Sequence, residues 1–494
     1  MRLCGKFKTL RTPARHDPHP PRRPDPPGLV LIAARLRAAL LIIGLGTLVV
    51  PMDTAVNVAF PAITQAFEIP VSDIQWIITM FGLAQVSLTM VFGRLGDRYG
   101  HRRVFITGLL TSALAFTLCA TAWSYPSLVL MRSLQGIGAG LVMACGPALV
   151  TVILPASQRR QALAFYTMLI GLGMFLGPFL GGLLVQFGGW PAVYWVRVPM
   201  ALLAALLIWQ LHELENNPAL MKARATARLK PMDVSGLVAT VLCLTAFVFV
   251  IVQIREQPFG LTALIGTLAT ALISLRWLFH QSLTATDPVL NIRLFREPGF
   301  AALQAAAVFI QAMTFSLLLL MPYRFIDWPG IGIAQAGFVL AAFPGGMVIA
   351  AMIGTRLSQR LRSHALLWMG MLLASAGLMG CAWFSLIESL PLTMTAMLLT
   401  GFGQGIFQVG HLDATVAAMP LGERGVAGSL VSVDRVLGFS LSANGVMWLH
   451  DILRDGQNES ADYFRTLLIV GAALGVAGFW FAARASKAPV AEPG

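Results

Sequence analysis

Fourteen long apolar segments determine what this chain can fold into. Each has about 20 residues, the length that an α-helix needs to cross a hydrocarbon core roughly 30 Å thick. The apolar residues are continuous and do not alternate with polar ones, which excludes a transmembrane β-barrel. The sequence therefore predicts an all-α polytopic membrane protein. The predicted helices cover residues 38–60, 74–93, 104–122, 126–153, 161–184, 190–210, 233–254, 261–281, 299–321, 335–355, 365–385, 390–416, 426–449 and 465–483.

Charged residues are scarce in this chain. They make up 12% of the 494 residues, and 57% of the residues are hydrophobic, whereas soluble domains contain about 25% charged residues. Several soluble domains of this total length would need far more polar surface. An ordinary cytosolic enzyme and a disordered chain are therefore excluded. The five cysteines are not at metal-ligand spacings from one another, so we expect no metal site.

The distribution of lysine and arginine predicts the orientation in the membrane. Of the 35 basic residues, 27 fall in the two tails and in alternate connections between the predicted helices. We therefore expect both termini on the cytoplasmic side. Residues 1–37 alone contribute +7 of the net charge of +13 and contain seven prolines. This composition predicts a disordered cytoplasmic tail, with contact to anionic lipid as the alternative, and no nucleic-acid interface.

Two sequence patterns occur twice at nearly the same spacing. Arg94–Arg98 is echoed by Arg356–Arg360, 262 residues later, and Gly136-x-Gly-x-Gly140 is echoed by Gly401-x-Gly-x-Gly405, 265 residues later. Two echoes at one offset predict two related halves of six helices each, a plan found in secondary transporters. The predicted parts are a tail at 1–37, a first half at 38–210, a linker with two inserted helices at 211–297, a second half at 298–484 and a tail at 485–494, giving a 6+2+6 arrangement.

The connection after the second predicted helix carries glycines and charges at close spacing. Glycines allow a tight turn between helix ends. An acid with several arginines can form a charge lock between helices and against a helix end. The alternative is a basic loop that only sets the topology. The residues are Gly93, Asp97, Arg98, Gly100, Arg102 and Arg103.

Two ionisable residues lie inside predicted helices, where charge is costly and usually functional. At 1.5 Å per residue, Asp53 and Arg132 are both roughly 8–9 Å below the outer face. Opposite charges at one depth can pair if their helices face each other. We therefore expect an ion pair in which Asp53 carries the transported proton and Arg132 is coupled to it. The alternative is a static pair that fixes helix packing.

The fifth predicted helix contains closely spaced small residues. Small residues four positions apart form a groove for a neighbouring helix, and Pro178 removes one backbone hydrogen bond. Ordinary tight packing is the alternative explanation. The residues are Gly173, Gly177, Pro178, Gly181 and Gly182.

These segments resemble signatures of the major facilitator superfamily, and most closely those of its fourteen-helix drug:proton antiporter branch. The matching stretches are Met52–Ile63, Gly93–Arg103, Leu130–Gly138 and Gly171–Gly182. The resemblance implies a major-facilitator fold and export of hydrophobic or cationic compounds in exchange for protons, by alternating access. It further implies a bacterial inner membrane, function as a monomer, and a proton gradient as the energy source without a cofactor.

The cargo surface is predicted from polar, aromatic and methionine side chains, because the last two adapt to varied apolar ligands. The alternative is that these side chains are core or lipid-facing residues. Arg435 either pairs with its neighbour Asp434 or faces the cavity, and His411 and Asp413 are either interface residues or members of a proton relay. The candidates are Asn57, Trp76, Met80, Gln135, Phe309, Met313, Phe315 and Arg435.

Two other functions compete with drug export. The first is transport of one dedicated metabolite or nutrient by the same fold. The second, more remote, is a membrane enzyme, but the chain has no His-Glu-x-x-His site and no Gly-x-Ser-x-Gly elbow. It also lacks a Gly-x-x-x-x-Gly-Lys-Ser/Thr loop, so ATP is not expected to drive it directly.

Overall fold

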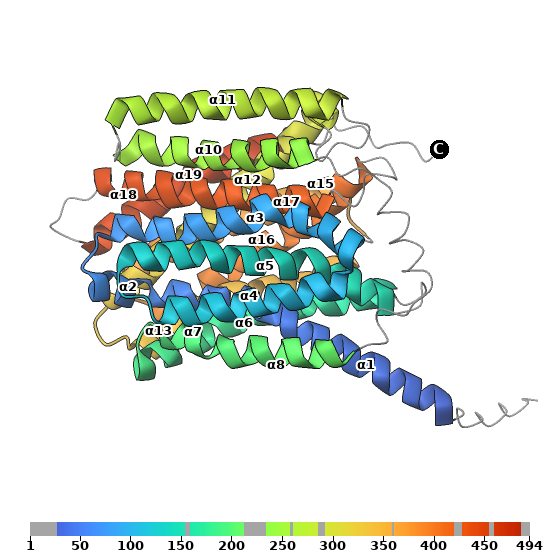
Figure 1. Cartoon of the computed structure of the whole chain (residues 1–494). Helices are drawn as coiled ribbons and strands as arrows, with labels where there is room; N and C mark the ends of the chain where they lie inside the picture. Colours follow the sequence, from blue (N-terminus) through green and yellow to red (C-terminus); the bar gives the residue numbers. More distant parts are fainter. Residues whose placement is uncertain are drawn as a thin grey trace, which may run out of the picture.

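A computed structural model describes residues 27–153, 159–211, 234–256, 260–284, 292–357, 360–418, 427–453 and 459–485. These residues are almost entirely helical, and the helices form a bundle of roughly parallel rods (Figure 1). Eleven of the helices are long and apolar enough to cross a membrane. The predicted all-α polytopic membrane protein is therefore confirmed. The predicted segments 74–93, 233–254 and 426–449 are helical but fall outside these eleven, so the count of fourteen spans stays a prediction.

The first part of the bundle contains the helices that precede residue 212. Their bounds are α1 Pro27–Leu48, η1 Pro51–Thr54, α2 Ala55–Phe67, η2 Val71–Asp73, α3 Ile74–Tyr99, α4 His101–Ala120, α5 Tyr125–Ile153, α6 Arg159–Gly188, α7 Ala192–Trp195 and α8 Arg197–Gln210.

The remaining helices begin with the pair expected as an insertion. Their bounds are α10 Val234–Glu256, α11 Gly260–Thr284, η5 Ile292–Arg296, α12 Pro298–Ile326, α13 Ile333–Leu340, α14 Ala342–Leu357, α15 Ser363–Leu386, α16 Leu390–Ala417, α17 Ala427–Leu441, the π-helical η7 Ser442–Val446, α18 Met447–Leu453 and α19 Glu459–Ala485.

The first helix is longer at both ends than the predicted 38–60. It begins at Pro27, so residues 27–37 are helical and do not belong to a disordered tail. A proline in the first turn is compatible with a helix, because the amide hydrogen it lacks would have no partner there. At the other end α2 continues to Phe67. Residues 1–26 lie outside the described residues, as does the predicted tail after Ala485.

The same packing pattern occurs twice. In the first part, α3 and α4 pack against α5, and α8 packs against α4 and α1. In the second part, α14 and α15 pack against α16 in the same way, and α19 packs against α15 and α12. The pair α10 and α11 lies to one side, with α10 touching α3 and α17 (Figure 1). The described helices are therefore related as two similar groups with one pair beside them.

The two groups touch each other through several helix pairs, among them α2 with α12. On one side α6 packs against α13 and α14, and on the other side α3 packs against α17. The contact between α6 and α13 is very close, because a Cβ atom added to Gly337 would come within 2.8 Å of the Gly182 Cα. Gly182 of the predicted motif therefore serves the contact between the two groups.

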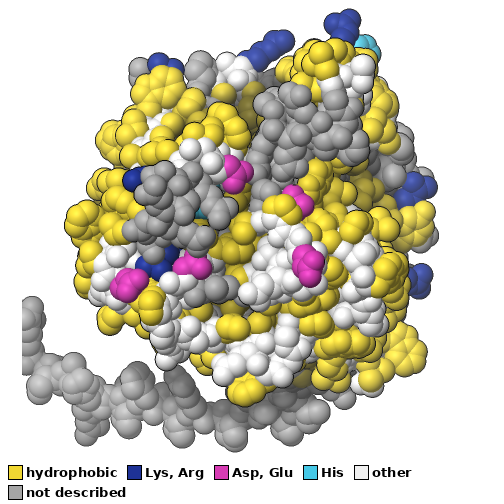
Figure 2. All heavy atoms as spheres, turned by 90° about the vertical axis from the view of Figure 1, so that its left-hand side faces the viewer, with side chains coloured by type: hydrophobic (Ala, Val, Ile, Leu, Met, Phe, Trp, Pro, Cys, Tyr) yellow, Lys and Arg dark blue, Asp and Glu magenta, His cyan; other side chains and the backbone are white. Residues whose placement is uncertain are grey.

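The bundle has two ends, which we call the α1 end, where α1 begins, and the far end opposite it. The turns that follow α2, α4 and α15 lie at the far end (Figure 1). Figure 2 looks onto the far end, where acidic side chains are scattered over a face of mainly apolar and uncharged polar groups. The turn between α3 and α4 lies at the α1 end.

Three glycines of α6 allow a close approach to the first membrane helix at the point where it breaks. A Cβ atom on Gly173 would lie 2.9 Å from the Leu48 carbonyl oxygen, and one on Gly177 would overlap Thr54 Oγ1. A Cβ atom on Gly181 would lie 3.0 Å from the Ala55 Cα. The stripe Gly173, Gly177 and Gly181 therefore holds the segment between α1 and α2 against α6.

We expect Gly177→Ala to destabilise the protein, because its new methyl group overlaps Thr54 and the backbone of the break. Overpacking of this kind costs about 1–3 kcal/mol. The matched control is Gly93→Ala, also within a helix, where nothing lies within 4 Å of the added Cβ. Thermal unfolding of the two purified variants checks this expectation. An equal melting temperature for both would contradict it.

Candidate functional site

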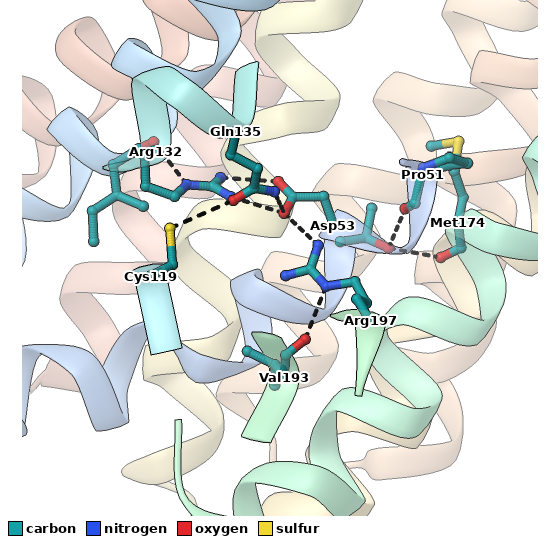
Figure 3. A network of polar contacts seen from close by, with 10 residues as sticks. Pro51, Asp53, Cys119, Arg132, Gln135, Met174, Val193 and Arg197 are labelled. Atoms are coloured by element: carbon teal, nitrogen blue, oxygen red, sulfur yellow. Dashed lines mark hydrogen bonds and ion pairs between the residues drawn. The ribbon is translucent and has the colours of Figure 1, made fainter. Parts of the chain in front are cut away.

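The first membrane helix is interrupted at Pro51, which begins the short 3₁₀ turn η1. Proline cannot donate the backbone hydrogen bond that would continue α1. The hydroxyl of Thr54 donates to the carbonyl oxygens of Pro51 (3.0 Å) and Met174 (3.1 Å), and the second bond ties the turn to α6 (Figure 3). Asp53 lies in this turn, so the glycine stripe of α6 and the break together position its carboxylate.

Two side chains of α5 bind the Asp53 carboxylate. The guanidinium group of Arg132 donates from Nη1 to Oδ1 (2.8 Å) and from Nη2 to Oδ2 (2.9 Å), a bidentate pair. The amide of Gln135 donates from Nε2 to Oδ1 (2.7 Å) and accepts from Arg132 Nη1 at its Oε1 (2.6 Å). The ion pair predicted from helix depth is therefore present, and Gln135 belongs to it.

A second arginine, which we did not predict, completes the group. Arg197 at the start of α8 donates from Nη1 to Asp53 Oδ1 at 2.8 Å (Figure 3). Its side chain is fully buried, and its Nη2 atom has no hydrogen-bond partner. We call Asp53, Arg132, Gln135 and Arg197 the Asp53 cluster.

The Asp53 cluster contains two positive groups and one carboxylate. Both arginine side chains are almost completely buried, and Asp53 is 14% exposed. Buried charge is costly unless it is paired and hydrogen-bonded. Since one carboxylate neutralises only one guanidinium group, the described cluster keeps a net positive charge inside the bundle.

Other contacts hold the two arginines independently of Asp53. Arg132 Nε donates to the Ile77 carbonyl (3.3 Å), and the guanidinium group lies 4.4 Å from the centre of the Phe81 ring. Arg197 Nε donates to the Val193 carbonyl (2.9 Å), and its guanidinium group lies 4.5 Å from the centre of the Phe116 ring. Cation–π contacts of this kind stabilise a desolvated positive charge. The arginines therefore keep partners when Asp53 is neutral.

The sequence contained a signal for Arg197. Arg197 lies seven residues into the predicted helix 190–210, about 10 Å from its outer end, which is nearly the depth of Arg132. By contrast, the depth assigned to Asp53 was counted from a helix start at residue 38, in a hydrocarbon core about 30 Å thick. Because α2 continues to Phe67, Asp53 is near the middle of the apolar stretch Ala38–Phe67.

The charged loop after α3 docks one arginine on a helix end. Gly100 has a φ of +107°, a conformation that favours glycine at the tight turn before α4. Buried Arg102 donates from Nε to the carbonyl oxygen of Ile208 (3.0 Å) and from Nη2 to that of Trp209, in the last turn of α8. Arg98 and Arg103 are exposed, and the Asp97 side chain lies outside the described residues. Gly93 is in a helix with open space beside it.

Several predicted cavity residues belong to contacts between helices. Trp76 packs against Phe249 of the inserted helix α10, with 6.0 Å between ring centres. Phe309 stacks on Phe481 (5.5 Å), and buried Met313 accepts a hydrogen bond from Ser375 at its sulfur atom (3.4 Å). All three side chains therefore make contacts between helices, and their assignment to a cargo surface stays a prediction.

Phe315 also packs in the second part of the bundle, where it stacks on Phe439 at 4.2 Å. Met80 and Asn57 are half-buried on α3 and α2. Asp434 pairs with His411 and not with its neighbour Arg435, because the His411 Nε2 lies 3.5 Å from the Asp434 Oδ2. Asp413 is exposed and accepts a hydrogen bond from Ser363.

The fold and this buried cluster describe a membrane protein that places charge in its interior, as secondary transporters do. The family model of the Major Facilitator Superfamily matches residues 43–443, so the chain belongs to this superfamily. It is a multi-pass membrane transporter and not an enzyme.

Known relatives include exporters and other transporters. The chain is 29% identical over 409 residues to the tetracenomycin C resistance and export protein of Streptomyces glaucescens, covering 81% of this chain and 73% of that protein. It is 26% identical over 408 residues to the riboflavin transporter RibZ of Clostridioides difficile, covering 81% and 85%. Among solved structures, the D-xylose-proton symporter has the same fold, with a TM-score of 0.63 at 15% identity, covering 92% of this chain and 98% of that one.

The contacts predict an order of stability for three variants. Asp53→Asn leaves two buried arginines without a counter-charge. We expect it to lower the free energy of unfolding by about 3–5 kcal/mol. Arg132→Met leaves Asp53 with the hydrogen bonds from Arg197 and Gln135. Arg197→Met should lower the free energy of unfolding least, by about 1–3 kcal/mol. The bidentate pair of Arg132 and Asp53 remains in this variant, and the excess positive charge of the cluster is removed. Thermal unfolding of the purified variants measures the order. A lower melting temperature for Arg197→Met than for Arg132→Met would show that this account of the cluster is wrong.

Proposed function

We propose that this transporter exports hydrophobic or cationic small molecules in exchange for protons, by alternating access of its two halves. The observation that carries the proposal is the buried carboxylate of Asp53, bound by Arg132 and Arg197 in a transporter fold. The resistance and export relative from Streptomyces glaucescens supports the direction of transport.

Protonation of Asp53 removes the negative charge that holds the cluster together. The two guanidinium groups then repel each other, with only their backbone and aromatic contacts left. Because the Asp53 turn is bonded to α6 through Thr54, a change in the cluster reaches the helix that packs against α13. Proton binding can in this way bias the contact between the two halves.

The remaining features of the proposal follow from the sequence. The proposal includes both termini in the cytoplasm, which the loop charges support, and a bacterial inner membrane and function as a monomer, which the resemblance supports. The proton gradient supplies the energy, and no cofactor takes part. The proposal assigns proton coupling to Asp53 and Arg132, and the conformational switch to the loop Gly93–Arg103.

Transport of one dedicated metabolite is the second candidate. It is favoured by the similarity to a riboflavin transporter, which covers 85% of that relative. Saturable riboflavin exchange by purified protein in liposomes, with no flux of cationic dyes, would favour this candidate over drug export.

We expect Asp53→Asn to abolish transport driven by a pH gradient, because asparagine cannot exchange a proton. The measurement is accumulation of a fluorescent cationic dye by proteoliposomes with an imposed pH gradient. Dye exchange without a gradient should continue in the variant, since alternation of the empty or loaded protein needs no proton. Asp413→Asn, which neutralises an exposed acid bonded to Ser363, is the matched control and should transport normally. Normal gradient-driven accumulation by Asp53→Asn would overturn the proposed role.

A further inference from the structure

A small cavity lies among three helices of the second half. Its volume is about 10 Å³, roughly the space that one water molecule needs. The cavity therefore has room for one group of that size, such as the ammonium head of a larger molecule. It is lined by Ala307, Ile310 and Gln311 of α12, Gln404, Phe407, Gln408 and His411 of α16, and Val431 and Asp434 of α17.

Hydrogen-bond acceptors outnumber donors around this cavity. The Gln404 amide donates from Nε2 to Gln311 Oε1 (2.5 Å), but its own Oε1 atom is buried without a partner. His411 Nε2 is bonded to Gln304 Oε1 at 3.1 Å. Asp434 Oδ2 is buried, 3.5 Å from His411 Nε2, and makes no hydrogen bond. Gln404 and Asp434 are 6% and 4% exposed, so two buried acceptors on the cavity wall lack donors.

A buried hydrogen-bond acceptor without a donor carries a large desolvation cost. An ionised carboxylate and an amide oxygen are both acceptors, and an alkylammonium group offers three N–H donors with a positive charge. The phenyl ring of Phe407 on the same wall adds a face that attracts cations. Arg435 is not among the residues that line the cavity.

The cavity and the Asp53 cluster lie in different halves of the bundle. Gln404 lies at the middle of α16, and His411 is six residues before its end, about 9 Å from the α1 end. Asp53 lies near the middle of the stretch Ala38–Phe67, and Arg132 is seven residues after the start of α5, about 10 Å from the far end. No residue of the Asp53 cluster lines the cavity.

We propose that this cavity binds the protonated amine of a cationic cargo molecule, with Asp434 and Gln404 as the accepting groups and His411 as the partner of Asp434 when the cavity is empty. The inference rests on the proposed function, whose cargo class it narrows. The site is separate from the Asp53 cluster, so cargo recognition and proton exchange are carried by different halves.

The test measures binding of dansylcadaverine, a fluorescent primary amine, to the full-length protein in lipid nanodiscs by fluorescence anisotropy. We expect Asp434→Asn to weaken binding about tenfold, which corresponds to about 1.4 kcal/mol. Gln404→Met, which removes the other acceptor at similar size, should weaken binding by a smaller factor. The uncharged N-acetyl derivative should bind equally to all variants, because it has no charge for Asp434 to pair with.

Asp413→Asn is the control, since it also removes one carboxylate charge, but from an exposed position on α16, outside the cavity lining. Equal amine binding by Asp434→Asn, Gln404→Met and the control would overturn the inference and leave a cavity that holds only water. Failure of the proposed function has a different result: the unmodified protein would bind the amine but not accumulate it under a pH gradient. Unaltered size-exclusion profiles for the variants ensure that lost binding reflects the site.

Discussion

The architecture of this transporter depends on one buried carboxylate that serves two buried guanidinium groups. Asp53 neutralises Arg132 and Arg197, which come from different helices, and its own position is set by a break in the first membrane helix. Unpaired charges inside a low-dielectric bundle would cost several kcal/mol each. The pairing of these charges therefore fixes the relative positions of several elements. They are the break in the first membrane helix, the stripe of glycines on α6, and the starts of α5 and α8.

The two halves share a packing pattern but differ in their buried chemistry. The first half contains an excess of positive charge and donors, and in Arg197 one donor atom has no partner. The second half contains an excess of acceptors around His411 and Asp434. Two buried sites of opposite polarity, one in each half, can bind two different species, here a proton and a cationic cargo. This difference supports a division of labour between the halves.

The parts of the site that could be predicted are residue types that are unusual in an apolar membrane helix, namely charged residues and closely spaced glycines. Asp53 and Arg132 were identifiable because charge in an apolar helix demands a partner, and Gly177 because small residues permit close contact. Arg197 carried the same signal, a charge inside a predicted apolar helix, and was not recognised. The roles of Trp76, Phe309 and Met313 could not be predicted in the same way, since an apolar side chain fits a cavity wall and a helix interface equally well.

The sequence by itself determined that the chain is a helical membrane protein of the major facilitator superfamily, because apolar length and close-spaced motifs are local properties. It also determined that Asp53 and Arg132 need partners. Only the tertiary structure decided that one carboxylate is shared by two arginines. It also decided that the Asp434 carboxylate lies beside His411 and not beside Arg435, and that Gly182 packs against Gly337. These contacts depend on the rotation of each helix about its axis, which packing between distant segments sets.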